Sequence, residues 1–106
     1  MEDEKILEVV MALIMHGGNA KSLGMEAIQA AKIGNTELAG QKLEEANNEL
    51  EEAHNAQTGL LTQEASGEKI QVTLLMVHAQ DHLMNAITFL DLTKEIVDVY
   101  KKCDCT

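Results

Sequence analysis

The hydrophobic pattern is most continuous from Leu74 to Ile87, a largely apolar run that also contains two histidines and an aspartate. On a helix of about 3.6 residues per turn, this segment and its continuation to Val99 show no purely polar face. Their side chains form three lines along the helix. The first line is Leu75, His78, His82, Asn85, Phe89, Leu92, Ile96 and Val99. The second line is Leu74, Val77, Asp81, Met84 and Thr88, and the third line is Val72, Met76, Ala79, Leu83, Ala86 and Leu90. A helix that is apolar all round either spans a membrane or is surrounded by protein.

The polar residues of this segment decide between these two possibilities. A membrane span needs about 20 nearly uninterrupted apolar residues and tolerates a central charge poorly, but Asp81 lies in the middle of the run. The helix is therefore predicted to be enclosed by protein. A chain of 106 residues has room for about two other long helices, which cannot cover every side. Other copies of the chain are predicted to cover the rest, so an oligomer is expected.

Two further helices are predicted before this segment. The first covers about residues 3–33, and residues 34–36 supply a glycine to end it and an Asn or Thr to cap the second. The second helix ends in residues 63–69, which are rich in helix breakers, and the third is predicted from near Glu68 to about Lys102.

The first two helices each have one predicted buried side, because their apolar residues recur at spacings of three and four. These residues are Ile6, Val10, Leu13, Ile14, Ala20, Leu23, Ala27, Ile28 and Ala31 in the first helix, and Ala39, Leu43, Ala46, Leu50, Ala53, Gln57 and Leu60 in the second. Gln57 is the polar member, so we expect it to hydrogen-bond across the bundle. Gly17 and Gly18 each cost about 1 kcal/mol relative to alanine. They predict a bend, a close approach or space beside a ligand.

Composition supports an all-α fold, because proline is absent, aromatic residues make up 2% and good helix formers dominate. Residues 1–106 are predicted to form one domain, an up-down three-helix bundle, with residues 103–106 as a flexible tail. Eighteen acidic residues against eight lysines give a formal net charge of −10. That charge excludes a nucleic-acid role and disfavours anionic membranes. A basic protein partner is the natural expectation.

The two ends of the chain bear on location. Residues 1–5 carry acidic side chains where a signal peptide carries basic ones, so neither export nor membrane insertion is indicated. Cys103 and Cys105 are so close together that a disulfide would close a very small ring. We therefore expect reduced thiols and a cytoplasmic protein.

The candidate chemistry centres on His78 and His82, which are four residues apart and so share one helical face. Three interpretations are open. The histidines are core residues satisfied by hydrogen bonds, or they bind a metal, or a neutral imidazole acts as a nucleophile. Glu51 and His54 match half of a di-iron motif whose second half is missing, so His54 is interpreted as a surface residue.

Asp81 adds a constraint, because a lone buried carboxylate is costly. Its line contains Leu74, Val77 and Met84 and has the character of a seam between subunits. If this helix lies on a symmetry axis, one Asp81 from each subunit meets there. A divalent cation, Mg²⁺ or Ca²⁺, would relieve their repulsion.

Five segments carry a resemblance to a known family. They are Val77-His-Ala-Gln-Asp-His-Leu-Met84, Gly18-Asn-Ala-Lys-Ser22, Glu26-Ala-Ile-Gln-Ala-Ala31, Glu52-Ala-His54 and Gln57-Thr58. From about residue 6 to about residue 101 the chain closely resembles the lactose/cellobiose-type IIA component of the bacterial phosphoenolpyruvate-dependent sugar phosphotransferase system. The resemblance implies a homotrimer of three-helix subunits, that is, a nine-helix bundle, which agrees with the oligomer expected above.

The resemblance also implies roles for individual residues. His78 stands where the family accepts a phosphoryl group, and Asp81 where it shares a divalent cation, expected here to be Mg²⁺, on the trimer axis. His82 and Gln80 stand where the family keeps polar neighbours of the site. The implied partners are the histidine phosphocarrier protein as donor, the IIB component with its acceptor cysteine and, through IIB, the membrane IIC permease. The implied cargo is a β-linked disaccharide such as cellobiose, chitobiose or lactose.

Two other functions remain open at this stage. A non-catalytic helical oligomer would use the His/Asp cluster only to hold a structural metal, and it would carry no covalent modification. A regulatory adaptor of the same fold would be phosphorylated without passing the group on.

Overall fold

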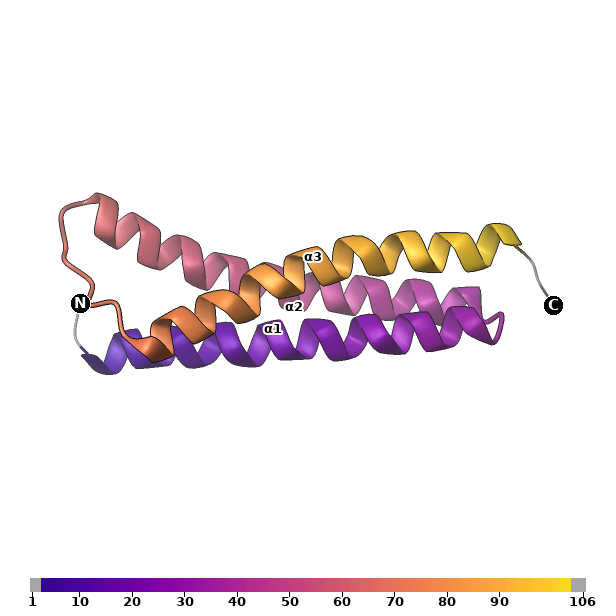
Figure 1. Cartoon of the computed structure of the whole chain (residues 1–106), viewed down its shortest axis with the longest axis horizontal. Helices are drawn as coiled ribbons and strands as arrows, with labels where there is room; N and C mark the ends of the chain where they lie inside the picture. Colours follow the sequence, from indigo (N-terminus) through magenta and orange to yellow (C-terminus); the bar gives the residue numbers. More distant parts are fainter. Residues whose placement is uncertain (1–2, 104–106) are drawn as a thin grey trace.

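The computed structural model describes residues 3–103, which form three helices of 30 residues each: α1 (Asp3–Lys32), α2 (Thr36–Ala65) and α3 (Leu74–Cys103). The chain runs up α1, down α2 and up α3 in a rod of 55 × 20 × 20 Å (Figure 1). The predicted all-α, up-down three-helix fold is confirmed, and no strand occurs within these residues. No helix among residues 3–103 is long and apolar enough to cross a membrane.

The turn between α1 and α2 forms as its sequence predicts. Gly34 has a φ of +79°, a left-handed conformation that glycine adopts without steric cost. The Asn35 side-chain oxygen accepts a hydrogen bond from the backbone N–H of Leu38 at 3.1 Å, so Asn35 caps α2. Because this turn is short, α1 and α2 run antiparallel and lie side by side from the turn, and α2 diverges from α1 toward its far end (Figure 1).

The connection between α2 and α3 is longer than predicted. The expected start of α3 near Glu68 is wrong, because residues 68–73 are not helical and α3 begins at Leu74. Gly67, with a φ of +100°, directs the chain out of α2. The Thr73 hydroxyl then accepts a hydrogen bond from the N–H of Met76 at 3.1 Å, which caps α3. The helix-forming residues of this stretch are thus overridden by a capping residue further along.

The far end of α3 also differs from expectation. Cys103 is the last residue of α3 rather than part of a tail, and residues 104–106 lie outside the described chain. Cys103 is disulfide-bonded, so the expectation of a reduced thiol is wrong at this residue.

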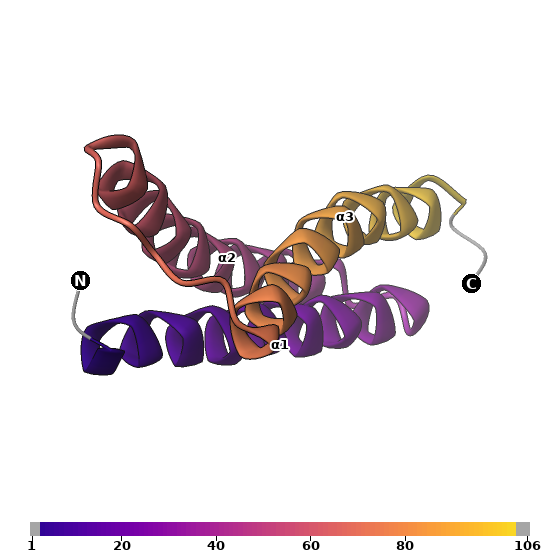
Figure 2. The same ribbon diagram turned by 60° about the vertical axis from the view of Figure 1, so that its left-hand side comes forward.

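The core lies where α1 contacts both other helices, and only one line of α3 faces it. That line is Met76, Ala79, Leu83, Ala86 and Leu90, with at most 6% of each residue exposed. The second line remains open to solvent: Leu74 is 86% exposed, Val77 51% and Met84 54%. At its start α3 also diverges from α2 (Figure 2), which leaves a groove of about 240 Å³ beside Leu60 and Met76. A single chain therefore covers α3 on one side only.

Two glycines of α1 give a matched test of this packing. A Cβ atom at Gly24 would stand 2.9 Å from the side chains of Leu90 and Phe89. A Cβ atom at Gly18 would have no described atom within 4 Å beyond the backbone of its own helix turn. We predict that Gly18→Ala raises the free energy of unfolding by about 1 kcal/mol through helix propensity. Gly24→Ala should lower it by about 1 kcal/mol, because Leu90 is buried and overpacking exceeds that gain.

Urea unfolding of both variants and wild type at one protein concentration measures these differences. Equal stabilisation by the two substitutions would contradict the close contact of α1 with α3 at Gly24.

Candidate functional site

The two histidines of α3 form a contacting pair. Their Nε2 atoms are 3.1 Å apart, and the rings meet edge to face with centroids 4.5 Å apart and planes at 89°. His78 is exposed, whereas His82 is partly buried one turn further along α3. The sequence spacing therefore brings the predicted pair together as expected, with one ring open to solvent and the other behind it.

The buried nitrogen of His82 determines where the protons lie. His82 Nδ1 is buried and has no hydrogen-bond partner among the described residues. A buried N–H without an acceptor costs about 1–3 kcal/mol, and orphaned buried N–H groups are rarer in proteins than under-used acceptors, so we assign the proton of the neutral His82 ring to Nε2. That N–H donates to His78 Nε2, which must then have a free lone pair, and the proton of the neutral His78 ring is on Nδ1.

This tautomer distinguishes between the chemical interpretations of the pair. Two histidines that bind one metal through Nε2 must both present a lone pair there. His82 would then carry its proton on the buried, unpartnered Nδ1. A nucleophile needs a lone pair on one accessible ring only, and His78 Nε2 provides it. The geometry therefore favours a nucleophilic His78 over a metal site made by the two rings.

Helix α1 supports the pair from behind through Gly17. A Cβ atom at Gly17 would lie 3.4 Å from the carbonyl oxygen of His82 and 3.7 Å from its Cβ. The close approach predicted at the glycine pair is thus confirmed at Gly17. The next residue, Gly18, leaves open space beside the same seam between α1 and α3.

Gln80 lies on another side of α3. Its side-chain oxygen accepts a hydrogen bond from Gln57 Nε2 at 2.6 Å, so the hydrogen bond predicted for Gln57 across the bundle is confirmed. Positions two apart on a helix point in nearly opposite directions, and Gln80 accordingly faces α2. Among the hydrogen bonds of the described chain, His82 contacts His78 and Gln80 does not.

Asp81 is exposed on the uncovered second line of α3, between Val77 and Met84. Within residues 3–103 no three His, Cys, Asp or Glu side chains of one chain gather in a way that could hold a metal ion. One chain therefore offers a single carboxylate at this place. His54 is exposed on α2, as the surface interpretation predicted.

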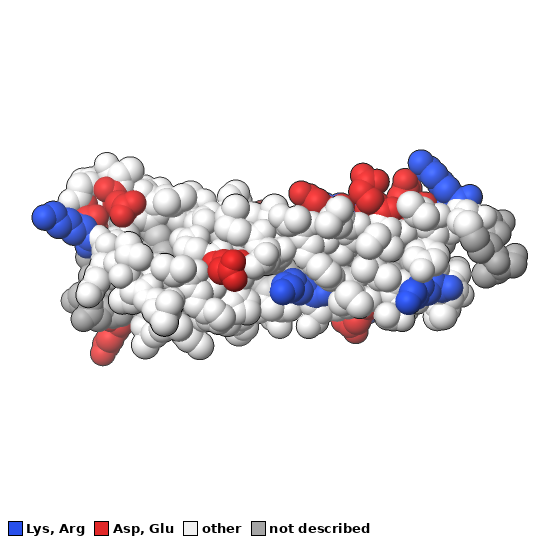
Figure 3. Space-filling model, viewed as in Figure 1, with Lys and Arg blue, Asp and Glu red and all other residues white. Residues whose placement is uncertain are grey.

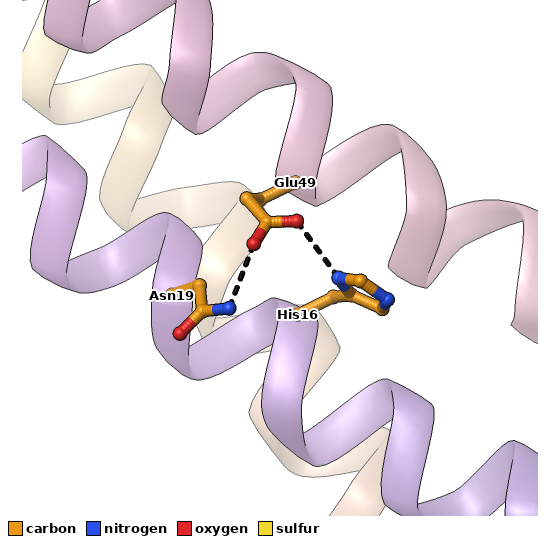
Figure 4. A network of polar contacts seen from close by, with 3 residues as sticks. All are labelled: His16, Asn19 and Glu49. Carbon is orange, nitrogen blue, oxygen red and sulfur yellow. Dashed lines mark hydrogen bonds and ion pairs between the residues drawn. The ribbon is translucent and has the colours of Figure 1, made fainter.

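A polar cluster between α1 and α2 was not predicted (Figure 4). Glu49 accepts a hydrogen bond from Asn19 Nδ2 at 2.7 Å through one oxygen and contacts His16 Nδ1 at 2.8 Å through the other. These hydrogen bonds, that of Asn19 first, hold the pKa of the Glu49 carboxyl below its usual range. In the sequence, the signal for this cluster is the three-residue spacing of His16 and Asn19, which places both side chains on one face of α1. The two residues flank Gly17 and Gly18, so the cluster holds α1 in place beside His82.

The lowered pKa gives Glu49 a pH-dependent effect on stability. Since the folded pKa lies below the ordinary value of 4.5, the contribution is present above pH 4.5 and is lost as the pH falls through the folded pKa. We predict that Glu49→Gln lowers the free energy of unfolding by about 0.5 kcal/mol at pH 7, a modest value because the carboxylate is partly solvated. The difference from wild type should be smaller at pH 3 than at pH 7, because the carboxyl of the unfolded chain is mostly protonated at pH 3.

Chemical unfolding at both pH values measures this, with Glu52→Gln on the exposed face of α2 as the control for the lost charge. A deficit in Glu49→Gln that is equally large at pH 3 would contradict the lowered pKa.

Comparison with known proteins gives consistent results. The family model for the lactose/cellobiose-specific IIA subunit of the phosphotransferase system matches residues 8–101. The lichenan-specific phosphotransferase enzyme IIA component of Bacillus subtilis is 52% identical over 100 residues, covering 94% of this chain and 91% of that protein.

Solved structures agree in fold. The cellobiose-specific enzyme IIA of Bacillus anthracis superposes with a TM-score of 0.89 at 44% identity, over 93% of this chain and 91% of that one. The chitobiose IIA component of Escherichia coli, solved in complex with HPr, gives a TM-score of 0.78 at 33% identity over 99% of this chain and 100% of that one.

Proposed function

The chain belongs to the lactose/cellobiose-specific IIA family of the sugar phosphotransferase system, and from this premise we propose that it is a phosphocarrier that uses His78. His78 accepts a phosphoryl group from the phosphohistidine of the histidine phosphocarrier protein and passes it to the cysteine of a IIB component. The observation that carries the proposal is the exposed His78 ring, whose Nε2 lies 3.1 Å from Nε2 of the partly buried His82.

The transfer requires little covalent machinery. The hydrogen bond from His82 Nε2–H to His78 Nε2 is released as the donor protein docks. The freed lone pair of His78 Nε2 then attacks phosphorus in line as the bond between phosphorus and the donor imidazole breaks, and the donor nitrogen keeps that electron pair. No base is needed, since the attacking nitrogen carries no proton. The His78 ring retains its Nδ1 proton and becomes cationic. The energy-rich N–P bond is conserved and not hydrolysed, so the group remains available to the IIB thiolate.

His82 and Gln80 have different supporting parts in this mechanism. Before transfer, His82 Nε2–H holds the His78 ring in the reactive tautomer. After transfer, the same N–H is free to donate to a phosphoryl oxygen. Gln80, bonded to Gln57, ties α3 to α2 at the level of the site and orients the helix rather than the phosphoryl group. Both residues are positioning residues.

The partners follow from the family and from charge. A related chitobiose IIA component is known in complex with HPr, and the net charge of −10 suits a basic donor protein. We place the protein in the cytoplasm, where IIB and the cytoplasmic side of the membrane IIC permease receive the group. The cargo is a β-linked disaccharide of the cellobiose, chitobiose or lactose class, in keeping with the lichenan and cellobiose specificities of two relatives.

We further propose a homotrimer with a nine-helix bundle. The line of α3 that contains Leu74, Val77 and Met84 is apolar and exposed in the single chain. The same line of two other copies of the chain, arranged around a threefold axis, would bury it. Three Asp81 carboxylates would meet in that seam. Hard oxygen donors suit Mg²⁺ or Ca²⁺, and such an ion would neutralise their repulsion. Its part is structural, and the phosphoryl transfer does not involve it.

Intact-protein mass spectrometry tests the phosphocarrier role. After incubation with phosphoenolpyruvate, the first enzyme of the system and the phosphocarrier protein, wild type should gain one acid-labile phosphoryl group. His78→Ala should gain none, because the nucleophile is gone, and His54→Ala should behave as wild type because His54 lies on the outside of α2. Addition that persists in His78→Ala would show that another residue accepts the phosphoryl group, and His82 would be the next candidate. No addition to wild type would leave the metal-holding oligomer as the better function.

The trimer and its cation can be tested through Asp81. Analytical ultracentrifugation should find about three chains per particle, and elemental analysis should find about one divalent ion per three chains. Asp81→Leu should lose the ion yet remain trimeric, because an apolar seam can replace paired charges. A monomeric wild type, or normal metal content in Asp81→Leu, would contradict this placement of Asp81.

A further inference from the structure

Lys21 is a partly buried lysine that has no ion-pair partner in the described chain. Only two lysines there, Lys21 and Lys42, are partly buried. Lys42 lies 3.7 Å from both Glu26 and Glu45, whereas Lys21 takes part in none of the ion pairs within residues 3–103. Partly buried lysines cover the aliphatic stem and keep the ammonium in water, so the Lys21 ammonium, which has no ion pair within residues 3–103, is available to an anionic ligand.

The register of the helices places Lys21 on the seam between α1 and α3. Gly17 packs on His82, and Gly24 packs on Phe89. The second contact lies seven residues after the first on both helices, so α1 and α3 run parallel here. Lys21 lies four residues after Gly17 and three before Gly24, and therefore on the same face of α1. It faces α3 one turn beyond His82.

The surroundings of Lys21 leave its side chain room to reach back toward the histidines. On its own helix, the positions three and four away are Gly17, Gly18, Gly24 and Met25, so no acidic residue competes for it there. Helical side chains lean toward the N-terminus of their helix. The four-carbon stem of Lys21 can therefore extend across the open space at Gly18 toward the level of His82.

The electrostatic setting gives such a cation unusual weight. Figure 3, in which α1 and α3 lie toward the viewer, shows a surface that is mostly uncharged between its two ends, with isolated acidic and basic groups. The chain as a whole has a net charge of −10. A phosphoryl group brought to His78 would therefore meet an acidic protein, and a lysine beside the site would offset that repulsion.

We propose that Lys21 is a phosphoryl-binding residue, whose ammonium donates to the phosphoryl oxygens at His78 during transfer and in the phosphohistidine. This role rests on the phosphocarrier function proposed above. Phosphoryl transfer depends chiefly on positioning and on stabilising charge on the equatorial oxygens, and Lys21 forms no covalent bond. The role also accounts for the glycine pair: Gly17 lets α1 approach His82, and Gly18 gives the lysine its path.

The test compares Lys21→Met, Lys21→Arg and Lys94→Met. Lys94 is exposed on α3 and has no ion pair among the described residues, so Lys94→Met controls for the lost charge. In single-turnover transfer from the phosphorylated carrier protein, Lys21→Met should be about 10- to 100-fold slower than wild type. Lys21→Arg should recover most of the rate, and Lys94→Met should stay within about twofold of wild type.

A second readout separates charge from structure. The ³¹P resonance of the phosphorylated protein is followed against pH, and a nearby cation favours the fully ionised phosphoryl group. The midpoint should therefore move to higher pH in Lys21→Met and stay in place in Lys94→Met. A merely structural lysine would leave it unchanged.

Gly18→Met provides an independent variant that keeps every charge. Methionine is a better helix former than glycine, so the fold should be at least as stable, yet its side chain fills the path of Lys21 and transfer should slow. Wild-type rate and ³¹P midpoint in Lys21→Met would overturn the role of Lys21 while leaving His78 as acceptor. A wild type that is never phosphorylated would instead overturn the phosphocarrier function itself.

Discussion

The hydrogen bond between the two imidazoles of α3 is the interaction on which the rest of the site depends. It has a direction because His82 Nδ1 is buried and has no hydrogen-bond partner among residues 3–103, which favours the tautomer with the proton on Nε2. That proton points at His78 Nε2, 3.1 Å away, and so fixes which nitrogen of His78 carries a lone pair. The burial of one ring thus sets the chemistry of the other, which remains accessible to a partner protein.

The helices around α3 maintain this arrangement. Gly17 allows the backbone of α1 to lie against His82, and Glu49 holds the flanking residues His16 and Asn19 from α2. On another side of α3, the hydrogen bond between Gln57 and Gln80 ties α3 to α2. The apolar line of α3 that contains Leu74, Val77 and Met84 is at least half exposed in the described part of one chain, and it is the surface that the proposed trimer would bury.

Much of the fold was predictable because it depends on local sequence. The periodicity gave three helices, and Gly34 and Asn35 marked the first turn. The start of α3 was misplaced because residues 68–73 have ordinary helix propensity, and the Thr73 cap outweighs it only in the context of the folded chain. At the site, the pairing of His78 and His82 followed from their spacing. The Glu49 cluster and the position of Lys21 did not, because both depend on the register between helices.

The most direct measurement is the tautomeric state of the two histidines, read from long-range ¹H–¹⁵N NMR correlations of the imidazole rings at neutral pH. Neutral His82 should be protonated on Nε2 and neutral His78 on Nδ1, with the His78 Nε2 signal typical of an unprotonated nitrogen. A His78 ring protonated on Nε2 would contradict the assignment, since the proposed nucleophile would then carry a proton.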